Sequence, residues 1–252
     1  MESPEIIQDL IFRIGANLLK CGAEISRVED TMKRLALHFG IDDPEIYVIT
    51  NGIFVSFYKN GRSEGTKLRD IRYINVDLNK LGALNELSRE ITAGKLEAGE
   101  ALEKVEEIEK SVSDPAWRIV LAAGFGGAAF CYLLGASLRD CLAAFLCGII
   151  VQSAGSFLEY KGILLSKAVA VIGGSLAATL ICALFMWLGL AKSMDNAVTG
   201  AIIPMIPGFA FVNGVRDIVD GNYISGFIRL ADALLIFFCL AIGVGLGLKL
   251  WY

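Results

Sequence analysis

The spacing of apolar positions changes near residue 115. Before it, apolar residues recur every three or four positions in some stretches and every second position in others, which predicts amphipathic helices and half-buried strands. After it, apolar runs reach the roughly 20 residues that a bilayer-spanning helix needs. The pattern predicts a membrane protein: an N-terminal cytosolic α+β domain over residues 1–114, then a bundle of five transmembrane α-helices over residues 115–252.

The first half is expected to follow the order ααβββαα. Ser3 and Pro4 are typical of a helix start, and Gly40 is expected to end the second helix, which begins near Glu24. Strands are predicted over residues 45–50, 52–58 and 66–74, with residues 59–65 as a hairpin loop. Helices over 76–94 and 95–112 complete a compact α+β domain with a small antiparallel sheet.

The second half contains five candidate spans joined by short connections, which require neighbouring helices to run antiparallel. Glycine, alanine and serine recur within them, and such small residues let helix backbones approach closely in lipid. The candidate spans are Ala116–Gly135, Leu138–Phe157, Ile163–Leu190, Asn196–Val212 and Ser225–Leu250.

The fourth span contains its own interruption. Pro204 and Pro207 each remove a backbone donor and clash with the preceding turn, and Gly208 follows them. Transporters use discontinuous helices to direct half-helix ends and free backbone groups toward a substrate. We therefore expect these three residues to mark a helix break that opens a polar cavity.

Ionisable residues in apolar helices are costly, and they mark a pathway or pair with another charge. Asn213, Arg216 and Asp217 share one face of the helix after the break, as do Arg229 and Asp232 in the last span. We interpret these five residues as candidates for substrate binding, with Asp232 the first choice for a coupling proton. The alternative stays open that the first group lies at the interface and that Arg229 and Asp232 pair with each other.

Charge distribution agrees with this division. Residues up to Asp114 include 15 Lys and Arg and 21 Asp and Glu, whereas the remaining 138 residues include only 8 and 6. The acidic N-terminus has no basic region typical of a signal peptide. A weak excess of Lys and Arg on one side predicts a cytoplasmic N-terminus and an outside C-terminus. These cationic residues are Arg118, Lys161, Lys167, Arg216 and Arg229 inside, against Arg139, Lys192 and Lys249 outside.

Several function classes find no support in the sequence. The six cysteines lack CxxC or metal-ligand spacing, and most lie in apolar stretches where cysteine acts as a small hydrophobe. There is no nucleotide-binding loop, catalytic triad or zinc motif. We expect neither an enzyme nor a cofactor, metal or nucleic-acid partner.

A polar stripe lies on the predicted second helix. Glu24, Arg27 and Thr31 are spaced along one face, with Glu29 beside them, and we assign these four residues to the cytosolic mouth of a pathway. The alternative is a helix-stabilising network of ion pairs, Glu24 with Arg27 and Arg27 with Asp30, which is common at i,i+3 spacing.

Two stretches carry a family resemblance. "LLKCGAEISRVEDTM" and "IPGFAFVNGVRDIVDGNYISGFIRL" together resemble the threonine/serine exporter family of inner-membrane proteins, and the resemblance extends over nearly the whole chain. Long members of that family have ten spans, and split members divide them between a larger subunit and a small five-span partner. With its five spans, this chain resembles the larger subunit of the split type.

The resemblance implies export of small hydrophilic metabolites across the bacterial inner membrane. The substrates implied are amino acids such as threonine and serine, or dicarboxylates such as succinate, and the expected assembly is a hetero-oligomer with the small subunit. A cation such as Arg216 or Arg229 facing a cavity suits such substrates. The rival hypothesis is a membrane-anchored sensor or scaffold without transport activity.

Overall fold

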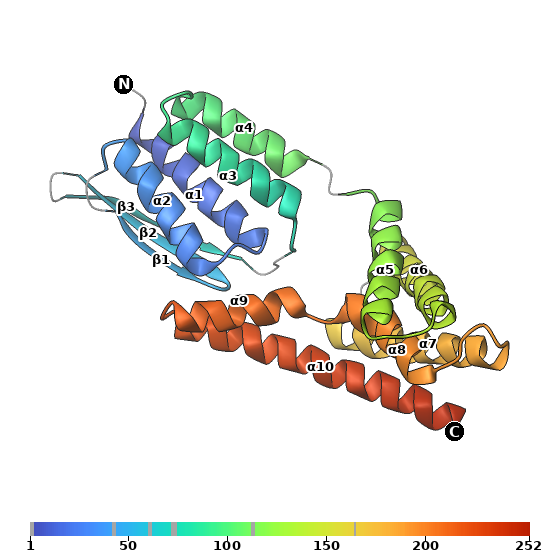
Figure 1. Cartoon of the computed structure of the whole chain (residues 1–252). Coiled ribbons are helices and arrows are strands. Elements are labelled where there is room, and N and C mark those ends of the chain that lie inside the picture. Colours follow the sequence, from blue (N-terminus) through green and yellow to red (C-terminus); the bar gives the residue numbers. More distant parts are fainter. Residues whose placement is uncertain (1–2, 42–43, 60–61, 72–74, 112–113, 164) are drawn as a thin grey trace. The chain divides into compact units, whose positions relative to one another are not determined.

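The computed structural model describes residues 3–41, 44–59, 62–71, 75–111, 114–163 and 165–252. They form two compact units, shown in Figure 1. The N-terminal unit comprises the described residues up to Ser111 together with Phe211–Leu230, and the helical unit comprises Asp114–Ala210 with Ala231–Tyr252. The described residues are mostly helical with a small three-stranded sheet, and the several helices of spanning length agree with the predicted membrane protein.

The N-terminal unit has a three-stranded antiparallel sheet in the order β1-β2-β3. Helices α1 and α2 pack against the sheet, and α3 and α4 pack on α1 (Figure 1). The elements are α1 (Pro4–Lys20), α2 (Ile25–His38), β1 (Glu45–Ile49), β2 (Gly52–Lys59), β3 (Arg62–Asp70), α3 (Leu78–Thr92) and α4 (Ala98–Lys110).

Local sequence explains how α1 begins and which face it buries. The Ser3 hydroxyl accepts a hydrogen bond from the Ile6 amide at 3.3 Å, and Pro4 occupies the first turn, where its missing N–H costs nothing. One face of α1, including Leu10 and Ile14, is fully buried with Met32 of α2. The apolar stripes of the helices and the apolar side chains on the inner face of the sheet together form one hydrophobic core.

The connection between β2 and β3 differs from the prediction. The predicted loop over residues 59–65 is wrong, because β2 reaches Lys59 and β3 begins at Arg62, with these two residues paired. A register shift at Phe57/Tyr58 lies opposite Gly65, whose φ of 129° suits glycine. The prediction placed Gly65 in a loop, whereas it lies within β3 at this register shift. The predicted end of the third strand, residues 72–74, lies outside the described residues.

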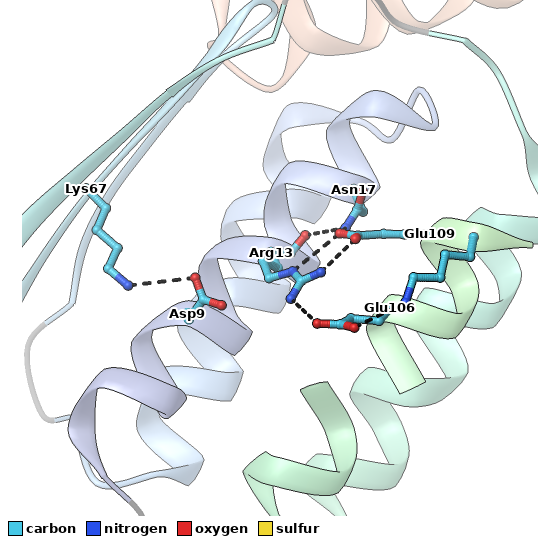
Figure 2. A network of polar contacts seen from close by, with 7 residues as sticks. Asp9, Arg13, Asn17, Lys67, Glu106 and Glu109 are labelled. Carbon is cyan, nitrogen blue, oxygen red and sulfur yellow. Dashed lines mark hydrogen bonds and ion pairs between the residues drawn. The ribbon is translucent and has the colours of Figure 1, made fainter. Parts of the chain in front are cut away.

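An ion-pair network joins α1 to α4 (Figure 2). The guanidinium of Arg13 contacts Glu106 at 3.0 Å and Glu109 at 2.7 Å, and Asn17 Nδ2 donates to Glu109 Oε1 at 2.6 Å. Partial burial opposes ionisation of Glu109, but the bonds from Arg13 and Asn17 outweigh it and lower its pKa. The bond from Arg13 likewise lowers the pKa of Glu106.

This network predicts a pH dependence of stability. A carboxylate whose pKa is lowered by folding stabilises the protein above its unfolded pKa of about 4.5 and loses that contribution as the pH falls through the folded value. We expect the melting temperature of the wild-type chain to fall more steeply below about pH 5 than that of Arg13→Met. Thermal unfolding in detergent at a series of pH values below and above about 5 measures this difference, with Arg34→Met as the control. Equal slopes of melting temperature against pH for the wild type and Arg13→Met would contradict the network's contribution.

The helical unit contains the apolar helices. They are α5 (Ala116–Leu133), α6 (Leu138–Tyr160), α7 (Lys167–Trp187), α8 (Met194–Ile202), the short 3₁₀ helix η1 (Ile203–Met205) and the later part of α10 (Tyr223–Trp251). Helix α9 (Gly208–Val219) begins here and continues into the N-terminal unit. By length and composition α5, α6, α7 and α10 are candidate membrane spans, and α8 with α9 forms a bent pair that is a fifth candidate if counted as one span.

Small residues bring the helices of this unit into close contact. A Cβ atom on Gly127 of α5 would lie 2.7 Å from the carbonyl oxygen of Gly200 on α8, and one on Gly148 of α6 would lie 3.1 Å from the carbonyl oxygen of Ala123. Backbones at this separation leave no room for a side chain. Gly127 and Gly148 therefore act in helix packing.

The fourth predicted span, Asn196–Val212, has different bounds in the structure. Helix α8 begins at Met194 and ends at Ile202, η1 holds Pro204, and α9 starts at Gly208 just after Pro207. The interruption thus falls at the prolines, where the helical hydrogen-bond pattern loses its donors. The helix predicted after the break, which includes Asn213, Arg216 and Asp217, agrees with α9 and ends at Val219.

Candidate functional site at the α1–α2 turn and the α9–α10 hairpin

The candidate site lies within the N-terminal unit, where the turn between α1 and α2 meets the hairpin of α9 and α10. Gly22 adopts a φ of 90° in the first connection, and Gly221 a φ of 86° in the second. Both values lie in the left-handed region that glycine adopts without strain. These glycines let each pair of helices reverse direction within a few residues.

The two helices of the hairpin touch through glycine. A Cβ atom on Gly226 would lie 2.7 Å from the carbonyl oxygen of Gly214, and one on Gly214 would lie 3.0 Å from Leu230 Cγ. This close approach places the polar faces of α9 and α10 side by side. Asn213 and Asp217 from α9 and Arg229 from α10 are all at least nine-tenths buried.

Main-chain groups of the α1–α2 turn bind this polar face. Asn213 Nδ2 donates to the Gly22 carbonyl at 3.3 Å, and Arg229 Nη2 donates to the Ala23 carbonyl at 3.1 Å. The Ile25 amide at the start of α2 donates to Asp217 Oδ1 at 3.4 Å. Glu24 precedes α2 without capping it by its own side chain, so Asp217 supplies the carboxylate at this positive helix end.

The centre of the site is a buried ion pair. Arg229 Nη1 lies 3.3 Å from Asp217 Oδ2, with side chains 7% and 0% exposed. The geometry is that of an ion pair without a well-directed hydrogen bond, because Asp217 Oδ2 has no hydrogen-bond partner among the described residues. A buried charge pair of this kind is costly to break from one side, since the remaining charge stays in a low-dielectric environment.

Further polar contacts surround the ion pair. Arg216 pairs with Glu24, and Ser26 Oγ donates to Asp220 Oδ2 at 3.0 Å. On the sheet side, the Thr50 amide donates to Ser225 Oγ at 3.1 Å. The contact therefore joins α2, the β1–β2 turn and both helices of the hairpin.

Four of the five predicted substrate-binding residues come together here. Asn213, Arg216, Asp217 and Arg229 belong to this one cluster, although Arg229 pairs with Asp217 across the hairpin. The fifth, Asp232, belongs to the helical unit, where Lys167 Nζ of α7 donates to its Oδ2 at 2.5 Å. The alternative that Arg229 and Asp232 pair with each other is not the arrangement found. A role in substrate binding stays a prediction for all five.

The predicted polar stripe on α2 does not form a single face. Thr31 is 2% exposed and lies among core residues, and Arg27 is exposed to solvent. Glu29 is half-buried and accepts a hydrogen bond from the Val48 amide at 3.0 Å, and burial raises its pKa against the opposing effect of that bond. The alternative of ion pairs from Glu24 and Asp30 to Arg27 is not the arrangement found. Glu24 pairs with Arg216, and Asp30 pairs with Arg34 at 3.0 Å.

Sequence reasoning missed several participants. The carbonyl groups of Gly22 and Ala23 act through the main chain, which no residue pattern reveals, and Ser225 gave no signal in an apolar run. In the helical unit, Asp140 forms a capping box with Ser137 and also accepts hydrogen bonds from the Lys192 and Ser193 amides at 2.6 and 2.9 Å. It thereby holds the start of α8.

Metal ligation finds no support in the described part of the chain. Among those residues no group of three or more His, Cys, Asp and Glu side chains is arranged to hold a metal ion. The chemistry available at the site is instead the binding of carboxylates by arginine. Arg216 and Arg229 each hold a carboxylate of the protein, and the same groups suit a carboxylate of a substrate.

Apolar helices of spanning length and a helix interrupted at prolines are typical of an integral membrane protein. The chain matches the model of the family described as "Putative threonine/serine exporter" over residues 9–251, and it belongs to that family. The resemblance inferred from the two sequence motifs is thereby confirmed. Those two motifs are the ones that meet at the candidate site.

Curated relatives agree with the family. The chain is 24% identical over 250 residues to the "Probable succinate transporter subunit YjjP" of Klebsiella aerogenes, covering 96% of this chain and 93% of the relative. It is 24% identical over 258 residues to the protein of the same name from Escherichia coli, covering 99% and 96%.

A longer relative is the "Probable threonine/serine exporter" of Mycobacterium tuberculosis. The identity is 23% over 245 residues, covering 96% of this chain but only 46% of that protein. No solved structure matches the chain.

Proposed function

We propose that this chain is the larger subunit of a two-component exporter of small hydrophilic metabolites. The substrates are threonine- or serine-type amino acids, or dicarboxylates such as succinate. The observation that carries the proposal is membership of the exporter family across residues 9–251. The arginine–carboxylate cluster at the candidate site supports it, because every substrate of this class bears a carboxylate.

The proposed partner is a small five-helix membrane subunit. Two observations support a partner. The first is that relatives matching this chain nearly end to end are named as transporter subunits. The second is that the Mycobacterium tuberculosis exporter is more than twice as long as the region matched. In the ten-span architecture that the family resemblance implies, the small subunit provides the five spans that accompany the five of this chain.

The proposed topology is multi-pass in the bacterial inner membrane. Residues 1–114 form the cytosolic domain, and residues 115–252 form five spans when α8 and α9 count as one. The N-terminus is cytoplasmic and the C-terminus is outside, in keeping with the excess of Lys and Arg. Reporter fusions placed after residue 60 and residue 252 test this arrangement, and an external residue 60 would overturn it.

The contact between the α1–α2 turn and the α9–α10 hairpin holds the cytosolic side of the substrate pathway closed. A substrate carboxylate replaces Glu24 at Arg216, or Asp217 at Arg229, and the exchange frees the hairpin from the turn. Pro204, Pro207 and Gly208 allow this movement because the helix is already interrupted there. Asp232 takes up the coupling proton when its pair with Lys167 opens.

Efflux from cells tests the function. Cells expressing the chain with its small subunit are expected to release preloaded threonine, serine or succinate faster than cells expressing either subunit alone. Equal efflux with the chain absent would refute the proposal.

Arg27 tests the cytosolic mouth. Its side chain is exposed on α2, so Arg27→Ala removes a charge without opening the core. We expect slower export at an almost unchanged melting temperature, since surface substitutions usually change stability by no more than about 0.5 kcal/mol. Arg34→Ala, an exposed arginine on the same helix, is the matched control and should export at the wild-type rate. Equal export by both variants would remove Arg27 from the pathway.

Asp232 tests the coupling proton. Asp232→Asn keeps the side chain's shape but cannot carry the charge or the coupling proton, so export should be slow throughout the range from about pH 6 to 8. Exchanging the pair, Lys167→Asp with Asp232→Lys, restores the ion pair without restoring the carboxylate on α10. Export by Asp232→Asn at the wild-type rate across this range would show that Asp232 is structural.

A further inference from the structure

A polar cavity lies in the N-terminal unit, away from the α9–α10 hairpin. It measures about 630 Å³ and is lined by residues of α1, β3, α3 and α4 together with the segment that leads into α3. This volume falls within the roughly 300–1,000 Å³ typical of small-molecule sites. None of its lining residues takes part in the contacts of the candidate functional site.

The walls of the cavity carry both signs of charge. Two nine-tenths-buried side chains, Asn17 and Cys21, contribute to its lining. The charged lining residues are four cations and three carboxylates: Arg13, Lys20, Arg69, Lys80, Asp9, Asp77 and Glu109. Such a lining excludes an apolar ligand, because burying these groups without polar partners is costly.

Part of this charge is already balanced within the protein. Arg13 is held by Glu106 and Glu109 in the network of Figure 2, and Lys80 Nζ donates to the Glu109 carbonyl at 3.2 Å. These contacts form a fixed wall along α4. The remaining cations of the cavity, Lys20 and Arg69, come from the end of α1 and from β3.

Arg69 is positioned by an aromatic ring. Its guanidinium lies 5.1 Å from the centre of the Phe12 ring, a cation–π contact that orients the group while leaving its N–H donors for another partner. Asp9 lies one turn before Phe12 on α1 and is 4.0 Å from Lys67. Asp77 caps α3 by accepting from the Lys80 amide at 3.0 Å. Cations and carboxylates thus face the same space.

We propose that this cavity binds a free α-amino acid on the N-terminal unit, at a site separate from the transport route. The ligand's carboxylate binds Arg69 and Lys20, and its ammonium group binds Asp9 or Asp77. A zwitterion suits the walls because each of its charges meets an opposite one. A polyanion such as a nucleotide meets three carboxylates here, and a dicarboxylate brings no cationic group to Asp9 or Asp77.

Binding of L-threonine and L-serine to the purified full chain tests the proposal. Isothermal titration is expected to show saturable binding that the double variant Lys20→Gln, Arg69→Gln weakens at least about tenfold, the effect of losing one charge-assisted contact. Lys104→Gln is the matched control, because Lys104 lies on α4 and pairs with Glu90 at 3.0 Å outside this cavity. Its binding should equal that of the wild type, and melting temperatures show that each variant is folded.

Three outcomes would overturn the proposal. They are no saturable heat up to about 10 mM amino acid, equal binding by the double variant and the wild type, or tighter binding of succinate or inorganic phosphate. The inference does not depend on export. The variant Asp217→Met, Arg229→Met removes the proposed transport contact and should still bind the amino acid, so loss of efflux and loss of this cavity's binding are separate results.

Discussion

Asp217→Ala is expected to destabilise the N-terminal unit by about 3–5 kcal/mol and to abolish export, because it leaves Arg229 buried without its partner. The side chain of Arg229 is only 7% exposed, so water cannot replace the lost carboxylate. The same substitution removes the acceptor of the Ile25 amide at the start of α2. Thermal unfolding in detergent and efflux from cells measure the two effects.

A matched set of variants separates the buried pair from its surroundings. Asp220→Ala removes a carboxylate three residues later that contacts only the Ser26 hydroxyl among its described partners, and it should leave the melting temperature nearly unchanged. The double variant Asp217→Met, Arg229→Met should recover most of the lost stability, since apolar pairs often replace buried ion pairs without loss. It should not recover export. An unchanged melting temperature for Asp217→Ala would mean that the pair is not formed in the protein.

Gly127→Ala is the second substitution with a large expected effect. Its new Cβ atom would lie 2.7 Å from the Gly200 carbonyl oxygen, so α5 and α8 must move apart. Overpacking of this kind costs about 1–3 kcal/mol. We expect a lower melting temperature and less correctly assembled chain in the membrane fraction.

The neighbouring residue provides the control. A Cβ atom on Gly126 of the same helix meets nothing within 4 Å, and alanine favours helix over glycine by about 0.8–1.0 kcal/mol. Gly126→Ala should therefore be neutral or stabilising. If both variants melt at the same temperature, the close approach of α5 and α8 is absent from the protein.

Patterns within single helices were predictable because they depend on neighbours in the sequence. The start of α1 at Ser3 and Pro4, the apolar runs of α5 to α7 and the interruption at Pro204 all follow from local rules. Small residues at helix crossings were also expected from composition. These features need no knowledge of which distant residues meet.

Partners distant in the sequence were not predictable in this way. The alternative hypothesis paired Glu24 with Arg27 one turn away, yet Glu24 pairs with Arg216, because helix spacing shows only which groups share a face. Thr31 continued a polar stripe by spacing, but its small side chain is buried in the core. Arg229 and Asp232 lie three residues apart and nevertheless pair with Asp217 and Lys167.

Transport by the purified protein tests the central claim most directly. Proteoliposomes that contain this chain and the small five-helix subunit, loaded with labelled threonine, serine or succinate, are expected to release one of these substrates when an ion gradient is imposed. Liposomes with either subunit alone, or with Asp217→Met, Arg229→Met in this chain, should retain it. Retention of all three substrates by liposomes in which both subunits are present and assembled would contradict the account.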